Sequence, residues 1–215
     1  MLLIKCQHTN QACFKVSART LPARLVAIEG IDQAGKQTQT MLLAKELKRK
    51  ELRANTISFP DYNSPSGRII KDYLEGKRRY QFQALCMLYS ANRWEQLDLL
   101  SELIEDNDLL VANRYTPSAM AYGVAGGLDI NWLRNLDKGL PEPDDVLVID
   151  VPIAASFARK TKRRDVYEND RGYLTTVKRA YRKLSRKFGW RVIDGRGDSS
   201  EVHQRIVSAL GTDLP

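Results

Sequence analysis

Residues 30–38 read Gly-Ile-Asp-Gln-Ala-Gly-Lys-Gln-Thr, with four residues between the two glycines and a lysine directly after the second. Glycines in such a loop let backbone N–H groups wrap an anion, and Lys36 would reach the terminal phosphates of a bound ligand. An apolar run precedes the loop and a helical pattern follows it, as this chemistry requires. The segment therefore predicts a phosphate-binding loop. Its predicted contacts are Gly30, Ile31, Gln33, Ala34, Gly35, Lys36, Gln37 and Thr38.

One position of the loop departs from the usual pattern. The residue after the lysine is normally a Ser or Thr whose hydroxyl binds magnesium. Here it is Gln37, whose amide oxygen can ligate the ion only weakly or through water. Thr38 lies one residue further along the helix and points in another direction. We therefore expect a weak metal site beside the loop.

The loop is part of a regular alternation of apolar runs and helical patterns. The predicted strands are 25–29, 55–59, 109–113, 146–150 and 191–194, and the predicted helices are 36–50, 66–75, 82–105, 118–124, 130–138, 153–159, 171–188 and 199–210. This order predicts an α/β fold with a doubly wound, five-stranded parallel sheet flanked by helices. Ligands of such sheets lie beyond the carboxyl ends of the strands, so functional residues are expected there.

Length and composition narrow the class of protein. The 215 residues, 43% hydrophobic and 28% charged, fit one globular domain. No apolar run reaches the ~18 residues that a bilayer span needs, so we expect no membrane partner. Cys6, Cys13 and Cys86 are too few, and odd in number, for a disulfide framework. They favour a reducing, cytoplasmic location.

The net charge of +8 is concentrated in two segments. Residues 1–28 hold four bases and no acid, and residues 159–196 hold 14 bases against 4 acids. Such a cluster fits either nucleic acid or a polyphosphate substrate. Nucleic-acid binding calls for aromatic rings interleaved with the charge, but Tyr173 and Tyr181 recur at helical spacing and are typical of a core stripe. We therefore expect no nucleic-acid partner.

Residues 1–23 stand apart from the rest. They lack acids, as a transit peptide does, and Cys6, His8 and Cys13 are three candidate metal ligands without a fourth. We interpret them as an N-terminal extension of a single domain over residues 24–215.

Several further blocks carry a family resemblance. They are Glu29-Gly30-Ile31-Asp32 through Lys36-Gln37-Thr38-Gln39, Phe59-Pro60-Asp61-Tyr62, Ser90-Ala91-Asn92-Arg93-Trp94-Glu95, Asn113-Arg114-Tyr115, Gly139-Leu140-Pro141-Glu142-Pro143-Asp144 and Tyr167-Glu168. In order and spacing the chain resembles thymidylate kinases, which phosphorylate dTMP, over about residues 25–210. The resemblance implies a P-loop kinase fold, ATP as phosphoryl donor with Mg²⁺, and a homodimer through the long helices.

The predicted helix 82–105 places Tyr89 and Arg93 on one stripe, where a ring and a planar fork suit a planar base. The resemblance implies that Tyr89 stacks on thymine and that Arg93 hydrogen-bonds it. Read without the resemblance, Tyr89 is equally a core residue and Arg93 a surface partner of Glu95 or Asp98.

Arg114 follows an apolar strand, where a guanidinium can clamp a phosphate bidentately. The resemblance implies that Arg114 holds the acceptor monophosphate and that Asp32 accepts the 3′-hydroxyl of its sugar. It also implies that Tyr62, Ser118 and Tyr122 line the deoxyribose, with the Tyr122 ring crowding out a 2′-hydroxyl.

The family's aspartate before this arginine is Asn113 here. Gln37 and Asn113, the two metal-linked positions, therefore both carry amides, which removes negative charge beside the ion. Glu29 and Asp150 are candidate substitutes, and Asp150 is alternatively only a helix cap.

Residues 159–165, Arg-Lys-Thr-Lys-Arg-Arg-Asp, resemble the start of the family's lid, expected over about residues 159–170. An arginine from such a lid stabilises the charge of the phosphoryl-transfer transition state. Arg164 is the first choice for this role and Arg159 the second. The alternative for each base of the segment is a solvated surface position.

The sequence thus predicts direct in-line transfer from ATP to dTMP for dTTP synthesis, with Lys36, Arg114, Arg164 and Asp32 as catalytic residues. A kinase for another pyrimidine nucleotide, such as dUMP or a nucleoside, is the alternative enzyme, because one methyl group discriminates by only ~1–3 kcal/mol. Gln37 and Asn113 favour a different alternative, a nucleotide-binding homologue with weak catalysis.

Overall fold

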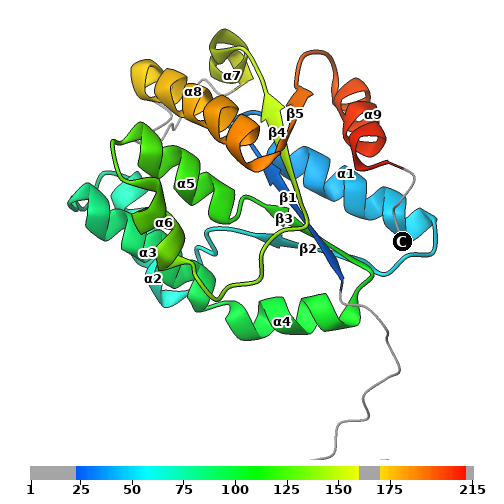
Figure 1. Cartoon of the computed structure of the whole chain (residues 1–215), viewed down its shortest axis with the longest axis horizontal. Coiled ribbons are helices and arrows are strands. Elements are labelled where there is room, and N and C mark those ends of the chain that lie inside the picture. Colours follow the sequence, from blue (N-terminus) through cyan, green and yellow to red (C-terminus); the bar gives the residue numbers. More distant parts are fainter. Residues whose placement is uncertain (1–22, 160–169, 212–215) are drawn as a thin grey trace, which may run out of the picture.

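The computed structural model describes residues 23–159 and 170–211, and its core is one parallel sheet (Figure 1). The strands are β1 (Arg24–Glu29), β2 (Ala54–Ser58), β3 (Leu109–Asn113), β4 (Asp145–Asp150) and β5 (Arg191–Asp194). They pair in the order β2-β3-β1-β4-β5, and every pair is parallel. The predicted doubly wound, five-stranded sheet is confirmed.

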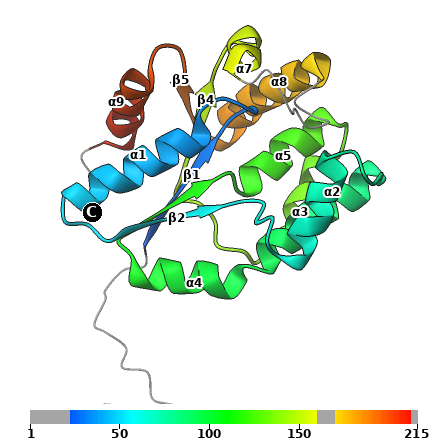
Figure 2. The same ribbon diagram turned by 180° about the vertical axis from the view of Figure 1, so that it is seen from behind.

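Helices cover both faces of this sheet. They are α1 (Lys36–Arg49), α2 (Pro65–Leu74), α3 (Phe82–Trp94), α4 (Leu97–Asp106), α5 (Thr116–Ala125), α6 (Ile130–Leu136), α7 (Ile153–Arg159), α8 (Arg171–Phe188) and α9 (Ser199–Leu210). α1 and α9 pack together on one face, while α4, α5 and α8 pack on the other (Figure 2). α2, α3 and α6 form an outer group that reaches the sheet through α5.

The central strands are apolar on both sides because both of their faces are covered. Val26, Ala27 and Ile28 of β1 have no exposed surface, and Leu109 to Ala112 of β3 are equally buried. Burying this surface is the main favourable term in folding. It fixes the register in which Ile28 of β1 lies beside Asn113 of β3.

This register sets the position of the site. β1 and β3 are neighbours, yet the helix that follows β1 is α1, on one face, and the helix that follows β3 is α5, on the other. The two connections therefore part at the carboxyl ends of the strands and leave a crevice between them. Glu29 at the end of β1 and Arg114 just after β3 meet there, and the Arg114 backbone N–H donates to the Ile28 carbonyl at 3.1 Å.

One predicted element is wrong. The single helix expected over 82–105 is two helices, α3 and α4, separated at Glu95 and Gln96. The Glu95 carboxylate accepts hydrogen bonds from the backbone N–H and the hydroxyl of Ser66, at the start of α2. The Gln96 amide donates to Asp61 at 3.1 Å. These contacts with residues about thirty positions earlier hold the segment where α3 ends and α4 begins. The spacing of apolar residues in the sequence gives no information about such contacts.

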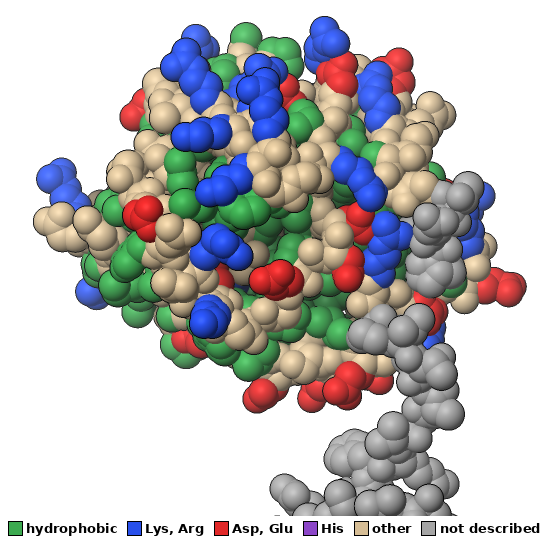
Figure 3. Space-filling model, in the orientation of Figure 1, with side chains coloured by type: hydrophobic (Ala, Val, Ile, Leu, Met, Phe, Trp, Pro, Cys, Tyr) green, Lys and Arg blue, Asp and Glu red, His purple; other side chains and the backbone are tan. Residues whose placement is uncertain are grey.

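The surface reflects the uneven charge of the sequence. Lys and Arg side chains gather over α8, whereas acidic side chains gather along α4 (Figure 3). On the inner side of α8, Tyr181 is buried together with Val177 and Leu184, and Tyr173 is partly buried against the core, so Tyr173 and Tyr181 form the predicted core stripe. None of the helices in the described ranges is both long and apolar enough to cross a bilayer.

Candidate active site

The phosphate loop joins β1 to α1 in the predicted geometry. Gly30 has a φ of 138°, and a Cβ there would lie 2.6 Å from the Ile149 carbonyl oxygen, so only glycine fits beside β4. Gly35 is the N-cap of α1 and has no side chain to satisfy the first N–H groups of the helix. Those donors and the positive end of the helix dipole are therefore available to an anion. Lys36 lies back over the loop and donates to the Ile31 carbonyl at 2.8 Å.

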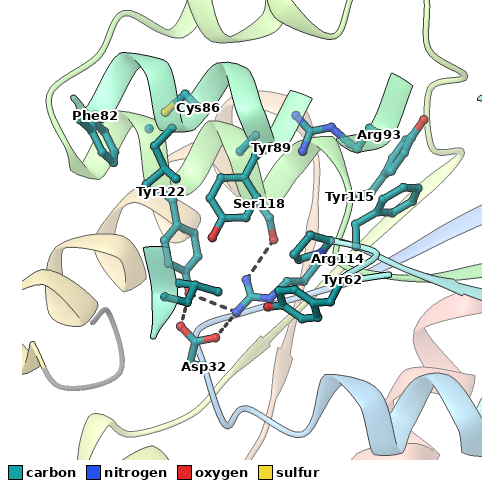
Figure 4. A pocket seen from close by; sticks show the side chains of 16 residues that line it. Asp32, Tyr62, Phe82, Cys86, Tyr89, Arg93, Arg114, Tyr115, Ser118 and Tyr122 are labelled. Carbon is teal, nitrogen blue, oxygen red and sulfur yellow. Dashed lines mark hydrogen bonds and ion pairs between the residues drawn. The ribbon is translucent and has the colours of Figure 1, made fainter. Parts of the chain in front are cut away.

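Asp32, Arg114 and Tyr122 form one cluster at the crevice (Figure 4). The Arg114 guanidinium is ion-paired with the Asp32 carboxylate, which also accepts the Tyr122 hydroxyl at 2.7 Å. Burial raises the pKa of Asp32, but the charges of Arg114 and Lys36 outweigh it and the net pKa is lowered. Asp32 is therefore a carboxylate at neutral pH and presents a negative acceptor beside the fixed cation of Arg114.

Arg114 has a left-handed backbone, with a φ of 64°, which is uncommon outside glycine and typical of functional sites. Its side chain also donates to the Ser118 hydroxyl at 3.1 Å. The guanidinium is thus held between the phosphate loop and the first turn of α5.

A buried carboxylate supports this arrangement from behind. Glu29 has no exposed surface and accepts three hydrogen bonds: from the Tyr115 backbone N–H at 2.7 Å, the Ser118 hydroxyl at 2.5 Å and the Tyr181 hydroxyl at 2.8 Å. Burial raises the pKa of Glu29, although these donors and Arg114 oppose the shift. Glu29 therefore ties β1, α5 and α8 together at the crevice.

A pocket extends from this cluster between α3 and α5, and we call it the α3–α5 pocket. It encloses about 760 Å³ of empty space, solvent at its mouth included, which is within the range of ligand sites. Its walls are mostly apolar, and Arg93 on α3 and the Asp32–Arg114 pair at the crevice add charged groups. The lining residues are Asp32, Phe59, Pro60, Tyr62, Leu74, Phe82, Leu85, Cys86, Tyr89, Arg93, Arg114, Tyr115, Ser118, Ala119, Tyr122 and Gly123.

Every predicted acceptor-side residue lines this pocket. Tyr89 and Arg93 project from α3, and Ser118 and Tyr122 from α5, while Tyr62 lies at the rim with 42% of its surface exposed. These side chains therefore lie together at one pocket, and their assignment to base and sugar remains a prediction.

The alternative interpretation of Arg93, a surface salt bridge to Glu95 or Asp98, is wrong. Arg93 is buried and paired with neither Glu95 nor Asp98. Its guanidinium donates to the Asp137 carboxylate from Nη2, at 2.7 and 2.8 Å, and from Nε, at 3.1 Å. Both residues are less than 10% exposed.

Comparison with known proteins assigns the family. The family model for thymidylate kinase matches residues 28–206. Thymidylate kinase of Schizosaccharomyces pombe is 32% identical over 87% of this chain and 91% of the relative, and that of Homo sapiens is 31% identical over 85% and 87%. The chain belongs to the thymidylate kinase family. The solved structure of thymidylate kinase from Candida albicans superposes with a TM-score of 0.81 at 27% identity, over 91% of this chain and 94% of that one.

For a member of this family, the predicted metal positions carry unusual groups. Gln37 is exposed at the start of α1, and the Asn113 Oδ1 is buried without a hydrogen-bond partner in the described part of the chain. Asp150 is ion-paired with Lys178 at 2.9 Å and with Arg182 at 2.6 Å, and Glu29 is held by its three donors. Both carboxylates are thus already engaged by other groups, and their role as substitutes for the amides remains a prediction. The donor set fits a magnesium ion held mainly by phosphate oxygens and water.

Of the two predicted lid arginines, Arg159 is among the described residues and Arg164 is not. Arg159, the last residue of α7, donates to the Gln33 carbonyl of the phosphate loop at 3.0 Å. Arg164 lies in 160–169, outside the described residues, and so does Tyr167-Glu168. Arg159 therefore reaches the loop, and the role of Arg164 remains a prediction.

Sequence reasoning missed several residues of the site. Cys86 lines the pocket one turn before Tyr89 and Phe82 two turns before it, and α-helical spacing from Tyr89 is a signal that finds them. Asp137 and the Tyr181 hydroxyl have no such signal, because they reach the site from α6 and α8 through the tertiary fold.

Proposed function

We propose that this member of the thymidylate kinase family transfers the terminal phosphoryl group of ATP to dTMP, giving ADP and dTDP for dTTP synthesis. The cluster of Asp32, Arg114 and Tyr122 carries the proposal. It lies between the phosphate loop, which suits the donor, and the α3–α5 pocket, which suits the acceptor.

The acceptor would enter the pocket with its base toward α3. A pyrimidine between apolar walls would stack on Tyr89 and accept a hydrogen bond from Arg93 at the inner end. Its sugar would then lie beside Tyr62, Ser118 and Tyr122. This direction brings the acceptor phosphate to Arg114.

Catalysis would consist of alignment and charge stabilisation. An acceptor phosphate is already an anion at neutral pH, so it attacks the terminal phosphorus of ATP without a general base. Lys36 and the N-terminal N–H groups of α1 would hold the donor phosphates, and Arg114 would hold the acceptor in line. Arg164 remains the first choice from the sequence for stabilising the developing charge. Arg159, the second choice, donates to the Gln33 carbonyl of the loop at 3.0 Å.

Mg²⁺ is expected with ATP. Its positive charge would neutralise part of the negative charge on the donor phosphates. The residues that would hold it are Gln37 and Asn113, through amide oxygens, and the buried Asn113 Oδ1, which has no partner among the described residues, supports this assignment.

We also propose a homodimer in the cytoplasm. The helices α2, α3 and α4 expose large apolar side chains, which a second copy would cover. These are Ile69, Met87, Trp94 and Leu99. Cys86 is an unpaired thiol, which fits a reducing compartment.

A phosphoryl-transfer assay tests the proposed function. ADP release is measured with dTMP, dUMP, thymidine and dCMP, each with and without magnesium. The expected result is turnover that requires ATP and is fastest with dTMP. Faster turnover with dUMP would support the alternative enzyme, and ATP binding without turnover would support the nucleotide-binding homologue.

Lys36→Ala should abolish this turnover, because it removes the cation that the loop places over the phosphates. Lys45→Ala, on the exposed side of the same helix, is the matched control and should keep normal activity. Normal activity of Lys36→Ala would contradict the phosphate-loop assignment.

A further inference from the structure

Asp137 is the C-cap of α6 and lies outside every motif of the sequence, yet it is bound to Arg93, which lines the α3–α5 pocket. Its two carboxylate oxygens accept three contacts from Arg93, all between 2.7 and 3.1 Å. The pair is buried, with side-chain exposures of 4% for Arg93 and 7% for Asp137. A pair so far from water is not one of the surface ion pairs that contribute little.

The carboxylate is itself held firmly. The Ser90 hydroxyl, one turn before Arg93 on α3, lies 2.8 Å from Asp137 Oδ1 and 2.9 Å from the Leu136 carbonyl. The Trp94 indole N–H donates to the same carbonyl at 2.9 Å. These three polar contacts join α3 to the end of α6 and fix the position of the Asp137 carboxylate.

The geometry leaves one side of the guanidinium for a ligand. Arg93 lines the pocket and Asp137 does not, so the carboxylate lies behind the guanidinium as seen from the pocket. Asp137 takes up Nε and Nη2, while Nη1 has no hydrogen-bond partner among the residues that the structure describes. Because the guanidinium is planar, fixing two of its nitrogens also fixes the direction of the third.

A guanidinium can only donate hydrogen bonds. A nitrogen held in one direction at the inner end of a base pocket therefore favours a base edge that carries a carbonyl oxygen and opposes one that carries an amino group. We propose that Asp137 is a positioning residue that fixes Arg93 and thereby makes the enzyme select 4-oxo pyrimidines, thymine and uracil, over the 4-amino pyrimidine cytosine. This inference rests on the proposed placement of the base beside Tyr89 and Arg93.

A positioning role and a purely structural role of Asp137 predict different effects on the affinity for acceptors. If Asp137 only stabilised the fold, its loss would weaken all acceptors alike. If it aims Arg93 at a carbonyl oxygen, its loss should weaken only the acceptors that carry this oxygen. Replacing Asp137 and removing the 4-oxygen from the ligand then act on one contact and are non-additive.

The test is equilibrium binding of dTMP, dCMP and the 2-pyrimidinone deoxynucleotide, which lacks any 4-substituent, to the full chain and to Asp137→Asn. The expected result is a loss of roughly tenfold or more in dTMP affinity, with 2-pyrimidinone affinity unchanged within about twofold. The ratio of dTMP to dCMP affinity should fall by roughly tenfold or more as well. An equal loss for all three ligands, or an unchanged dTMP to dCMP ratio in the folded variant, would overturn the inference.

Asp145→Asn is the matched control. Asp145 is also a buried carboxylate paired with two arginines, Arg24 at 2.5 Å and Arg191 at 3.0 Å, but it begins β4 and does not line the pocket. Both variants should lower the melting temperature, and only Asp137→Asn should change the ligand ratios.

Ser90→Ala keeps the inference testable if Asp137→Asn does not fold, because it loosens the carboxylate without leaving Arg93 unpaired. It should shift the dTMP to dCMP ratio in the same direction by a smaller factor, and an unchanged ratio would count against the proposal. Binding is measured without turnover, so a chain that binds dTMP but does not phosphorylate it refutes the proposed function and still tests Asp137. A chain that binds none of the three nucleotides refutes both.

Discussion

The Arg114 guanidinium and the Asp32 carboxylate, 82 positions apart in the chain, form an ion pair across the crevice between β1 and β3. The pair joins the loop that would hold the donor to the strand end that would hold the acceptor. A ligand entering the α3–α5 pocket therefore meets a cation whose position is already set by the phosphate loop, and alignment of the two substrates is partly built in before either binds.

Asp32→Asn should lower kcat/KM for dTMP by roughly 100-fold, because it removes the charge that orients Arg114 and the proposed acceptor of the sugar hydroxyl. If Asp32 does contact the 3′-hydroxyl, 3′-deoxy-dTMP should lose less than dTMP when the residue is changed. Steady-state rates with both acceptors give the comparison. Asp108→Asn, which breaks the exposed pair with Arg53 elsewhere, should leave the rates unchanged.

The fold follows closely from the sequence, since all five strands begin and end within one residue of the predicted bounds. Strands buried on both faces must be apolar throughout, and residues such as Val26 and Val111 carry that signal locally. The break between α3 and α4 carries no such signal, because Glu95 bonds to Ser66 only once α2 is packed in place.

The site divides in the same way. Lys36 and Arg114 were predicted from their places in the loop and at a strand end, where topology alone brings residues together, whereas Asp32 was predicted from the family resemblance. The residues that orient these side chains were not predicted from the sequence. Asp137 is 44 positions from Arg93, and Tyr181 is 152 positions from Glu29, and each pairing depends on how helices pack rather than on spacing.

Tyr122 should control the choice of sugar through its ring and not through its hydroxyl. Tyr122→Ala should reduce the preference for dTMP over ribothymidylate by at least about tenfold, because it opens the space of a 2′-hydroxyl. Tyr122→Phe keeps the ring and should keep the preference, although it loses the 2.7 Å bond to Asp32 and some turnover. Acceptor competition assays measure the preference, and an unchanged value in Tyr122→Ala would show that the sugar is selected elsewhere.

Cys86 should be a slow nucleophile whose reaction reports on the pocket. Burial raises the pKa of its thiol to about 11, and Arg93 only partly opposes this. Only the thiolate is alkylated, so the rate should rise about tenfold per pH unit from pH 8 to pH 10, without the plateau that an ordinary thiol reaches near its pKa. Mass spectrometry of a chain with Cys6 and Cys13 replaced by Ser measures this rate, and dTMP should slow it. A plateau near pH 9 would contradict the buried environment of Cys86.

The two amides, Gln37 and Asn113, make the sharpest prediction about magnesium. If they have only loosened the metal site, turnover should still require magnesium, but at a higher concentration than a hydroxyl and a carboxylate would need. Gln37→Thr and Asn113→Asp should each lower the magnesium concentration for half-maximal rate. The new hydroxyl and the new carboxylate act on one ion, so their effects should be non-additive.

The nucleotide-binding alternative predicts instead that the parent chain binds ATP without turnover at any magnesium concentration and that only the double variant gains activity. A magnesium titration that follows dTDP formation in the parent, both single variants and the double variant separates these outcomes. Asp150→Asn is the control, because its carboxylate is already paired with Lys178 and Arg182 and should leave the magnesium requirement unchanged. Full parental activity at low magnesium, unaffected by either substitution, would show that neither amide is near the ion.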